Sequence, residues 1–377
     1  MIITEGNTKI SLTNDHETVF YNERGSFNRS LGVIFIAAEN ELKERKLDVA
    51  DVFAASGVRG IRYANETESI KTLYLNDISP NSEKILKKNI KMNQIDSFSE
   101  VYIKDANYFL VLKATEGEKL DVVDIDPFGP PTPFIDCGLQ AVKKNGVIAI
   151  TATDLAPLCG IPKKAALRKY GSLSIREEFC HETASRILIK IVLEACGRRG
   201  LTGKPLLTVF TEHYIRFYAR IKKSKDEYPY SKIGFIFSCS KGHWITTSSM
   251  SEKFENICRL CDTKCVVAGP LWLGKLHDEA TLDRIFSKID ILKNETHKRK
   301  ITKLIPRFKE EDMVSIPYFF DIARTADRLD VTTPSIDFVM KNLIRLGFTA
   351  YRTHFSHTGV KTNAPRDIFS EIVSQKT

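Results

Sequence analysis

The sequence predicts an α/β fold, in which helices cover a mostly parallel sheet, followed by a smaller α+β region. Three observations support this prediction. From about residue 30 to residue 222, short β-rich runs alternate with segments of helical periodicity, which is the order of βαβ units. The β-rich runs are almost continuously apolar, as in strands buried on both faces of a sheet. Two consecutive β-rich runs close the region and predict an antiparallel pair at one edge.

The individual elements follow from these patterns. The expected parallel strands are residues 48–54, 71–76, 100–103, 120–125 and 146–150. The expected crossover helices, with apolar side chains at helical spacing, are residues 58–66, 80–92, 106–114 and 134–143. Ser79 as N-cap and Pro80 in the first turn predict where the second of these helices begins. The remaining elements expected here are a long helix over 175–199, with an apolar stripe of Ile187, Leu188, Ile191, Val192 and Ala195, and the antiparallel pair over 206–211 and 214–221.

A polar stretch that begins at Lys222 (KKSKDEYPYSK) predicts a domain boundary between residues 1–222 and residues 223–377. In the second part, the expected elements are helices over 322–329 and 335–346 and a strand over 348–355. This order fits a helix-turn-helix or winged unit, and it also fits other small α+β modules.

The composition indicates a folded soluble protein. Of 377 residues, 42% are hydrophobic and 27% are charged, which is close to the average globular chain. The longest apolar run, residues 33–38, is too short to cross a bilayer. The first residues, MIITEGNTKI, do not resemble a secretory signal, so we expect a cytoplasmic protein.

The charge balance favours polyanionic partners. Lysine and arginine number 56 against 47 acidic residues, a formal net charge of +9. Residues 293–309 hold seven of these cations and a single acid, Glu295. This stretch is either a surface that contacts nucleic acid or an ordinary solvated helix face.

Acidic residues end three successive expected strands, at the edge where α/β sheets bind nucleotides. Asp51 is followed by a turn with Gly57, whose lack of a side chain lets the backbone approach a ligand or simply allows a tight turn. Asp77 is placed to hold both hydroxyls of an adenosine ribose. Asp105 is placed to bind an adenine amino group, while the N–H of Ala106 donates to the base.

The strongest local motif is Asp124-Ile-Asp126-Pro-Phe128-Gly-Pro-Pro131, after the fourth expected strand. An acid followed by proline and an aromatic residue is similar to the acceptor site of methyltransferases that act on exocyclic amines of bases. An aryl amine is a poor nucleophile, so Asp126 would align it and receive its proton. Phe128 would stack on a base turned out of its helix. The structural alternative is a rigid loop.

The eight cysteines fall into two groups. Cys137, Cys159, Cys180 and Cys196 are scattered, and we expect them to be buried or free thiols. The second group lies within 27 residues and consists of Cys239, Cys258, Cys261 and Cys265, together with His243. The Cys258-x-x-Cys261 spacing is that of half a zinc site, with His243 or Cys265 as the fourth ligand, whereas a lost ancestral site is the alternative.

Taken together, the motifs resemble tRNA (guanine(26)-N2)-dimethyltransferases of the archaeal and eukaryotic type over nearly the whole chain. The strings that carry this resemblance are Phe20-Tyr-Asn22, Asn28-Arg29, Ser56-Gly-Val-Arg-Gly-Ile-Arg62, Leu75-Asn-Asp-Ile-Ser79, Asp126-Pro-Phe-Gly129, Thr151-Ala-Thr-Asp154, Ala156-Pro-Leu-Cys-Gly160, Gly269-Pro-Leu-Trp-Leu-Gly274 and Arg352-Thr-His-Phe355.

The resemblance implies a class I (Rossmann-like) methyltransferase domain and a C-terminal domain that contacts tRNA. It implies transfer of one or two methyl groups from S-adenosylmethionine to N2 of guanosine 26. We expect no membrane association, and no obligate protein partner is evident from the sequence. The alternative is methylation of another guanosine of tRNA or of a base in another nucleic acid. A non-catalytic RNA-binding protein on the same scaffold is a further alternative.

The resemblance also assigns residues. It places the cofactor contacts on Arg29, Arg62, Asp77, Asp105 and Ala106, and the catalytic acid on Asp126. Many relatives carry two complete Cys-x-x-Cys pairs where this chain has one, so zinc is in doubt. Guanosine 26 must be flipped out of the tRNA to be reached. We expect residues 293–309, and the region around Arg352 and Lys361, to contact the tRNA backbone.

Overall fold

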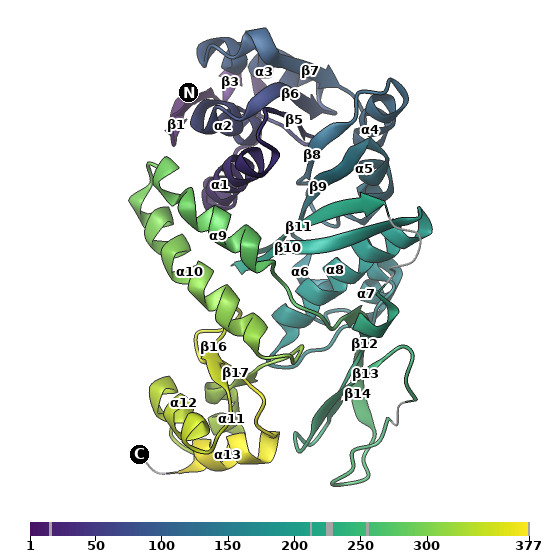
Figure 1. The fold of residues 1–377 in the computed structure, drawn as a ribbon, viewed down its shortest axis with the longest axis vertical. Coiled ribbons are helices and arrows are strands. Elements are labelled where there is room, and N and C mark those ends of the chain that lie inside the picture. Colours follow the sequence, from purple (N-terminus) through teal and green to yellow (C-terminus); the bar gives the residue numbers. More distant parts are fainter. Residues whose placement is uncertain (15–16, 212, 224–228, 254–255, 376–377) are drawn as a thin grey trace.

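The computed structural model describes residues 1–14, 17–211, 213–223, 229–253 and 256–375. A seven-stranded sheet forms the centre of the N-terminal half (Figure 1). Its strands, in spatial order, are β10 (Leu201–Thr211), β11 (Tyr214–Lys223), β9 (Val142–Ala152), β8 (Leu120–Ile125), β5 (Leu47–Asp51), β6 (Ile70–Asp77) and β7 (Ser99–Ile103). The five strands from β9 to β7 are parallel, and β11 is antiparallel to both β9 and β10. The strand order reverses between β5 and β8, which is where such sheets bind ligands.

Helices cover both faces of the sheet. One face packs against α1 (Ser26–Lys43), α2 (Val58–Thr67) and α3 (Pro80–Met92), and the other against α4 (Ala106–Thr115), α5 (Ile135–Ala141) and α8 (Cys180–Arg198). Two buried clusters correspond to these two faces. The apolar run of residues 33–38 forms the middle of α1 and is buried throughout, because α1 lies between the sheet and α9.

The predicted strands and crossover helices are confirmed, with four differences. The predicted strand 48–54 ends at Asp51, because the chain turns towards α2 from Val52 onwards. The predicted helix 134–143 stops at Ala141, because Val142 already pairs with β8 as the start of β9. The predicted helix 175–199 begins only at Cys180, because the preceding chain is held extended where Leu173 pairs with Gly269. Ser79 is the N-cap residue of α3, but its side chain makes no capping hydrogen bond, and its backbone N–H donates to Asp77.

Several elements were not predicted. The N-terminal ones are the hairpins β1 (Ile2–Glu5) with β2 (Thr8–Ser11) and β3 (Thr13–Asn14) with β4 (Glu17–Thr18). The short helices α6 (Leu155–Leu158) and α7 (Lys163–Tyr170) precede α8. After the boundary come a three-stranded sheet of β12 (Ile233–Cys239), β13 (Ile245–Ser249) and β14 (Cys265–Trp272), and the helices α9 (Glu279–Ser287) and α10 (Glu295–Met313).

The C-terminal elements form a winged helix-turn-helix unit, one of the two alternatives that the sequence left open. In chain order they are β15 (Phe320–Asp321), α11 (Ile322–Leu329), α12 (Ile336–Arg345), β16 (Ala350–Arg352), β17 (Gly359–Thr362) and α13 (Arg366–Ser374). The strands form one sheet in the order β15-β17-β16. The predicted strand over 348–355 is limited to β16, because the chain turns at residues 356–358 to pair β16 with β17.

The two halves of the chain share their buried clusters. Figure 1 shows α9 and α10 running from α1 down to the C-terminal unit. Ile285 on α9 and Ile305 on α10 belong to the same cluster as the α1 side chains, and β14 packs on α8. The expected boundary stretch overlaps residues 224–228, which lie outside the described residues, and the division at residue 222 stays a prediction.

Lys361 was expected at a tRNA-binding surface, and this expectation is wrong. Only 1% of Lys361 is exposed, and its ammonium group is bound by Glu182 of α8. Lys361 lies on β17 and faces α8, so it is buried between the two halves of the chain as an ion-pair partner. Arg352 is partly exposed and pairs with Asp337 at 2.7 Å. No helix in the described part of the chain is long and apolar enough to cross a membrane.

Candidate active site

A cavity of about 810 Å³ lies at the carboxyl edge of the sheet. Its lining comes from the ends of β5, β6 and β8, the residues just before α4, and the segment 20–29 that leads into α1. Phe134 just before α5, Thr151 and Thr153 at the end of β9, and His213 and Tyr214 at the start of β11 complete it. The parallel strands thus bring together residues that are 100 positions apart in sequence, from Asp51 on β5 to Thr151 on β9.

Three of the expected cofactor residues line this cavity in fixed orientations. The Asp77 carboxylate accepts hydrogen bonds from the backbone N–H groups of Ala55 and Ser79, both at 2.8 Å. Oδ1 of Asp105 caps α4 by accepting from the N–H of Tyr108 at 3.1 Å. Ala106 is the first residue of α4, where a backbone N–H has no acceptor within the helix.

Asp51 also lines the cavity and is buried. Its Oδ2 accepts from the N–H of Gly60 at 3.1 Å. Burial raises the pKa of Asp51 to about 7, although the Arg59 guanidinium opposes this shift. Asp51 is therefore a carboxyl group that gains or loses its proton near neutrality.

The cavity wall contains unsatisfied polar groups. Four buried atoms of lining residues have no hydrogen-bond partner among the described residues: Asp51 Oδ1, Ser56 Oγ, Asn76 Oδ1 and Tyr214 Oη. An unsatisfied buried polar group costs about 1–3 kcal/mol. A ligand rich in hydroxyl and amino groups can supply the hydrogen bonds that these four atoms lack.

Gly57 and Arg62 are not among the lining residues. Gly57 has a φ of +80° as the N-cap of α2, and a Cβ there would lie 2.9 Å from both Ile61 and Leu86, so it shapes the turn. Arg62 is buried and donates to Glu66 and Glu5 at 2.7 Å each. The sequence could not show which residues of this turn and helix face the cavity, because the direction of each side chain depends on how α2 is oriented in the fold.

Arg29 does line the cavity, and Glu5 fixes its position. Arg29 Nε and Nη2 donate to the two carboxylate oxygens of Glu5, which Arg62 also binds. Burial raises the pKa of Glu5, but Arg29 and Arg62 outweigh it and lower the pKa to about 2. Arg62 thus acts on the cavity through Glu5. Nη1 of Arg29 has no acceptor within the described residues and is free to donate to a ligand.

Asp126 lies at the cavity wall directly after β8, with about a quarter of its side chain exposed. Its Oδ2 is bound by Nη2 of Arg59, a buried residue of α2. Nη1 of Arg59 lies 3.7 Å from Asp124 Oδ2. Oδ1 of Asp126 has no partner in the part of the chain that the structure describes. Arg59 therefore fixes one carboxylate oxygen of Asp126, and the other oxygen is available to accept a hydrogen bond from a ligand.

Behind Arg59, a buried network holds Asp124. Arg216 of β11 binds both Asp124 oxygens, at 2.8 and 2.6 Å, and Tyr63 donates to Oδ2 at 2.7 Å. Burial raises the pKa of Asp124, but Arg216 and Arg59 outweigh burial and keep it below the ordinary value. The network holds the Arg59 guanidinium in place on the side away from the cavity, so Arg59 can orient the Asp126 carboxylate.

Phe128 projects from the loop after Asp126 and is 77% exposed. Its ring meets that of Phe20 edge to face, with centroids 4.6 Å apart. Oγ1 of Thr153 accepts from the N–H of Gly129 at 2.8 Å and anchors the loop to the end of β9. An exposed aromatic pair beside an anchored carboxylate is suited to holding a flat, polar ring.

Sequence reasoning missed Arg59, Tyr214 and His213 as lining residues. Arg59 stood in one of the strings that carried the resemblance, but nothing distinguished it from Arg62, three positions later. Tyr214 and His213 lie at the start of an edge strand, and no sequence signal shows that this end faces the cavity.

The second cysteine group gathers at one end of the β12–β14 sheet. Cys239, which ends β12, is the register partner of Cys265, which begins β14. The sulfur atoms of Cys239 and Cys261 are 3.6 Å apart, and a ring nitrogen of His243 lies within 4.8 Å of both. The thiol of Cys258 hydrogen-bonds with Cys239 and Cys261. All the expected ligands are thus neighbours.

The electrostatics of this group suit a soft metal ion. Burial raises the pKa of the Cys239 thiol, but backbone N–H groups of His243 and Lys241 outweigh it and lower the pKa to about 6. Thiolates with an imidazole are the donors of structural zinc sites. The group lies far along the chain from the carboxyl-edge cavity and contributes no residue to its lining. Zinc stays a prediction.

Comparison with known proteins identifies the family. Residues 1–374 match the family model of N2,N2-dimethylguanosine tRNA methyltransferases. The tRNA (guanine(26)-N(2))-dimethyltransferase of Methanobrevibacter smithii is 32% identical over 381 residues, which cover 98% of this chain and 96% of that protein. A relative from Aquifex aeolicus named tRNA (guanine(26)-N(2)/guanine(27)-N(2))-dimethyltransferase is 32% identical over 99% of this chain and 95% of its own length.

A solved structure agrees over the whole chain. Trm1 from Pyrococcus horikoshii in complex with S-adenosyl-L-methionine is 30% identical, has a TM-score of 0.86 and covers 99% of both chains. The class I methyltransferase fold expected from the sequence is therefore confirmed. The chain belongs to the N2,N2-dimethylguanosine tRNA methyltransferase family.

Proposed function

We propose that this protein transfers methyl groups from S-adenosylmethionine to the exocyclic N2 amine of guanosine 26 in tRNA, in one or two rounds. The observation that carries the proposal is the geometry of Asp126. One of its oxygens is anchored by buried Arg59, the other is free, and exposed Phe128 stands beside it at a cavity whose wall carries three further acids. The names of the family and of its relatives support the same reaction.

The cavity residues fit S-adenosylmethionine. Asp77 is fixed by two backbone N–H groups and can accept from the ribose hydroxyls. Oδ2 of Asp105 and the N–H of Ala106 offer an acceptor and a donor to the adenine edge. Nη1 of Arg29 can bind the methionine carboxylate. When bound, S-adenosylmethionine supplies an electrophilic methyl group on a sulfonium sulfur.

The protein's own residues then hold the guanine base and accept the proton that it releases. Phe128 and Phe20 provide a stacking surface for the flipped guanine, and base–aromatic stacking is worth about 1–3 kcal/mol. Oδ1 of Asp126 accepts an N–H of the amine and aligns its lone pair. As the N–C bond forms and the bond between the methyl carbon and sulfur breaks, the amine becomes cationic and acidic, and Asp126 receives the proton. A carboxylate suffices as the base, because an aryl ammonium group is a strong acid.

The substrate test is methyl transfer from labelled S-adenosylmethionine to tRNA transcripts. We expect label in a transcript with guanosine 26 and none in a matched transcript with adenosine 26, and digestion should place the label on N2. Equal labelling of both transcripts contradicts the proposed position. Guanosine 27 is a second candidate position, because the relative from Aquifex aeolicus is named for both. Transcripts with adenosine at either position or both separate the two.

The basic stretch 293–309 lies largely on α10 and is suited to contact the tRNA backbone. Ile301, Ile305 and Phe308 face the interior, and Lys300 also points inward, over the Phe27 ring and to Thr211, so the other cations are available on the outer side. Lys298 and Lys309 are paired with acids, whereas Arg299 and Lys303 are exposed and form no ion pair within the described residues. A cytoplasmic location stays a prediction.

Charge reversal tests this surface. The triple variant Lys293→Glu, Arg299→Glu, Lys303→Glu is expected to raise the Kd for tRNA about tenfold and to flatten its salt dependence, because phosphate contacts are lost. The Kd for S-adenosylmethionine should not change. An unchanged Kd for tRNA would mean that α10 is only a solvated face.

A further inference from the structure

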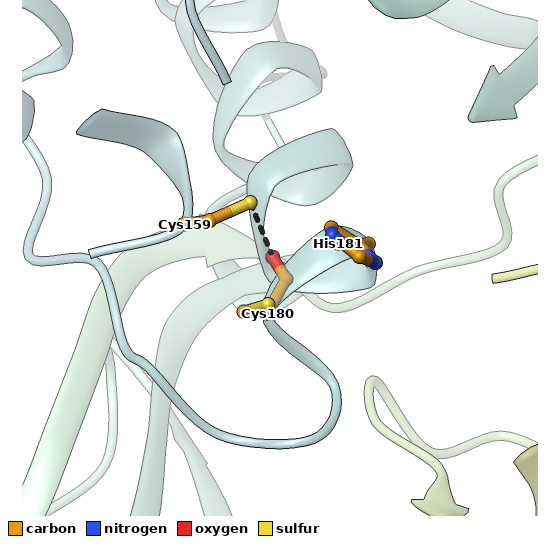
Figure 2. A group of neighbouring side chains, drawn as sticks. All are labelled: Cys159, Cys180 and His181. Carbon is orange, nitrogen blue, oxygen red and sulfur yellow. Dashed lines mark hydrogen bonds between the residues drawn. The ribbon is translucent and has the colours of Figure 1, made fainter. Parts of the chain in front are cut away.

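Two of the cysteines expected to be isolated thiols form a cluster with a histidine (Figure 2). Cys159 follows α6, and Cys180 and His181 are the first two residues of α8. Their sulfur atoms and one ring nitrogen all lie within 4.8 Å of one another. All three side chains are half-buried. This cluster shares no residue with the Cys239 group or with the cavity lining.

The cluster is held by its surroundings. The thiol of Cys159 donates to the backbone carbonyl of Cys180 at 3.9 Å, as the dashed line in Figure 2 marks. The His181 ring stacks on Phe210 with centroids 4.2 Å apart. The ring also donates a hydrogen bond to the carbonyl of Phe355. Histidine ligands of metals commonly donate one ring N–H to a carbonyl, which leaves the other nitrogen as the ligand.

The local field favours the thiolate at Cys180, because the hydrogen bond with Cys159 lowers the pKa of Cys180, whereas the same hydrogen bond and burial raise the pKa of Cys159. Cys180 is the first residue of α8, a helix of 19 residues whose positive end faces the cluster. The Arg324 guanidinium acts on Cys180 and His181 from α11. Helix N-termini and nearby cations stabilise thiolates, which are the form that binds metals. Two thiolates together balance the charge of a divalent ion.

We propose that Cys159, Cys180 and His181 bind one thiophilic divalent metal ion of the zinc class, with a fourth position open to water. In a tetrahedral zinc site, sulfur ligands lie about 3.8 Å apart, given Zn–S bonds of about 2.3 Å. The donors therefore need to close by about an ångström at most. Each thiol that binds releases its proton to solvent, and no redox change is involved. The half-exposed side chains give an ion access to the site.

The position of the cluster suggests what the ion does. Cys159 lies six residues after Thr153, which anchors the loop that carries Phe128. His181 contacts Phe210 of β10 and residue 355 of the winged unit. A bound ion therefore ties the segment behind the catalytic loop to the junction of the two halves of the chain. Its role is to fix these parts, and the transfer chemistry does not pass through it.

Cobalt(II) titration of the full chain, followed by the sulfur-to-cobalt charge-transfer absorption, tests the proposal. The background variant Cys239→Ser, Cys261→Ser removes donors of the other cysteine group. In this background we expect one equivalent of cobalt to bind. Adding Cys159→Ser should abolish the band, and adding His181→Gln should raise the Kd at least tenfold. Adding Cys137→Ser, another half-buried cysteine, should change nothing.

Three outcomes overturn the proposal. The first is a background variant that remains folded by circular dichroism and binds no cobalt. The second is a band that survives Cys159→Ser. The third concerns oxidation. If hydrogen peroxide converts Cys159 and Cys180 to a disulfide while zinc gives no protection, the cluster is a redox pair and not a metal site. If the background variant fails to fold, the stoichiometry in the otherwise unchanged chain decides, because Cys159→Ser should lower it by one equivalent.

Discussion

The two ends of the parallel strands differ in their balance of charge. At the carboxyl edge, the cavity wall holds four acids and four cations, namely Asp51, Asp77, Asp105 and Asp126 with Arg24, Arg29, Arg59 and Lys104. At the amino edge, a hollow of about 730 Å³ is lined by seven charged residues, all of them basic: Lys119, Lys143, Lys144, Arg198, Arg199, Lys222 and Lys223. The whole-chain charge of +9 is therefore unevenly distributed, with a site of balanced charge and a basic hollow on the same sheet.

The two edges also differ in how their charges are held. The carboxyl-edge acids accept hydrogen bonds from backbone N–H groups or from a buried arginine, so their directions are set before a ligand arrives. At the amino edge, five of the seven cations form no ion pair within the described residues, and these five are exposed. Fixed groups give specific binding and catalysis, whereas mobile surface charges give general attraction.

The largest effect is expected from Asp126→Asn at the carboxyl edge. An amide cannot receive the proton of the amine, so methyl transfer should fall at least a hundredfold. The Kd for S-adenosylmethionine should stay within twofold. Asp136→Asn, which changes an exposed acid of α5 paired with Arg198, is the matched control and should keep full activity. If Asp126→Asn keeps more than a tenth of the activity, another group is the proton acceptor.

A smaller effect is expected from Asp77→Asn. Hydrogen bonds to a charged group contribute about 1.5–3 kcal/mol, so the loss of charge should weaken binding of S-adenosylmethionine about tenfold to a hundredfold. Calorimetric titration measures this Kd directly. The rate at saturating cofactor should change little, since Asp77 does not touch the acceptor amine in the proposed mechanism. Unchanged cofactor affinity would remove Asp77 from the binding site.

The pH dependence of stability should separate the two edges. The pKa of Asp51 is raised to about 7 in the folded state, so this group stabilises the fold most below about pH 4, and that contribution is lost as the pH rises towards 7. A tenfold difference in proton affinity between the folded and unfolded states is worth about 1.4 kcal/mol. As the pH rises from 5 to 8, the unchanged protein should therefore lose stability relative to Asp51→Asn. Urea unfolding of both proteins at each pH would measure this difference.

Asp121 at the start of β8 is the matched control at the other edge. Burial raises its pKa, but Arg45, the N–H of Asp48 and Lys143 outweigh burial and lower the pKa to about 2. Its contribution is present above about pH 4 and is lost only as the pH falls through 2. Asp121→Asn should therefore cost the same stability at pH 5 and at pH 8. Parallel pH profiles for the two variants would mean that the pKa of Asp51 is not raised.

The smallest effect is expected at the amino edge itself. Reversing the exposed charges of Lys144 and Lys223 should raise the Kd for tRNA less than threefold, and the effect should vanish at high salt. The α10 variant, with three reversals, should have a clearly larger effect. If the amino-edge variant weakens tRNA binding as much as the α10 variant, the basic hollow is a specific contact surface.

The sequence by itself determined most of the sheet and the acids along it. Buried parallel strands have to be continuously apolar, and the chain leaves each one at the carboxyl edge, so Asp77, Asp105 and Asp126 could be placed from strand ends alone. The helix 80–92 was predicted to the residue because proline fixes its start. The helix of residues 26–43 was missed, because its apolar run lacks the one-sided pattern of a surface helix.

Only the tertiary structure decided which members of a motif face the cavity and which support it. Arg59 and Arg62 lie three residues apart on one helix, yet one holds Asp126 and the other reaches the site only through Glu5. Cys159 and Cys180 looked isolated because 20 residues separate them, and Lys361 looked like a surface cation until β17 buried it against Glu182. Sequence patterns record the period of an element, whereas contacts between distant elements depend on how their faces pack.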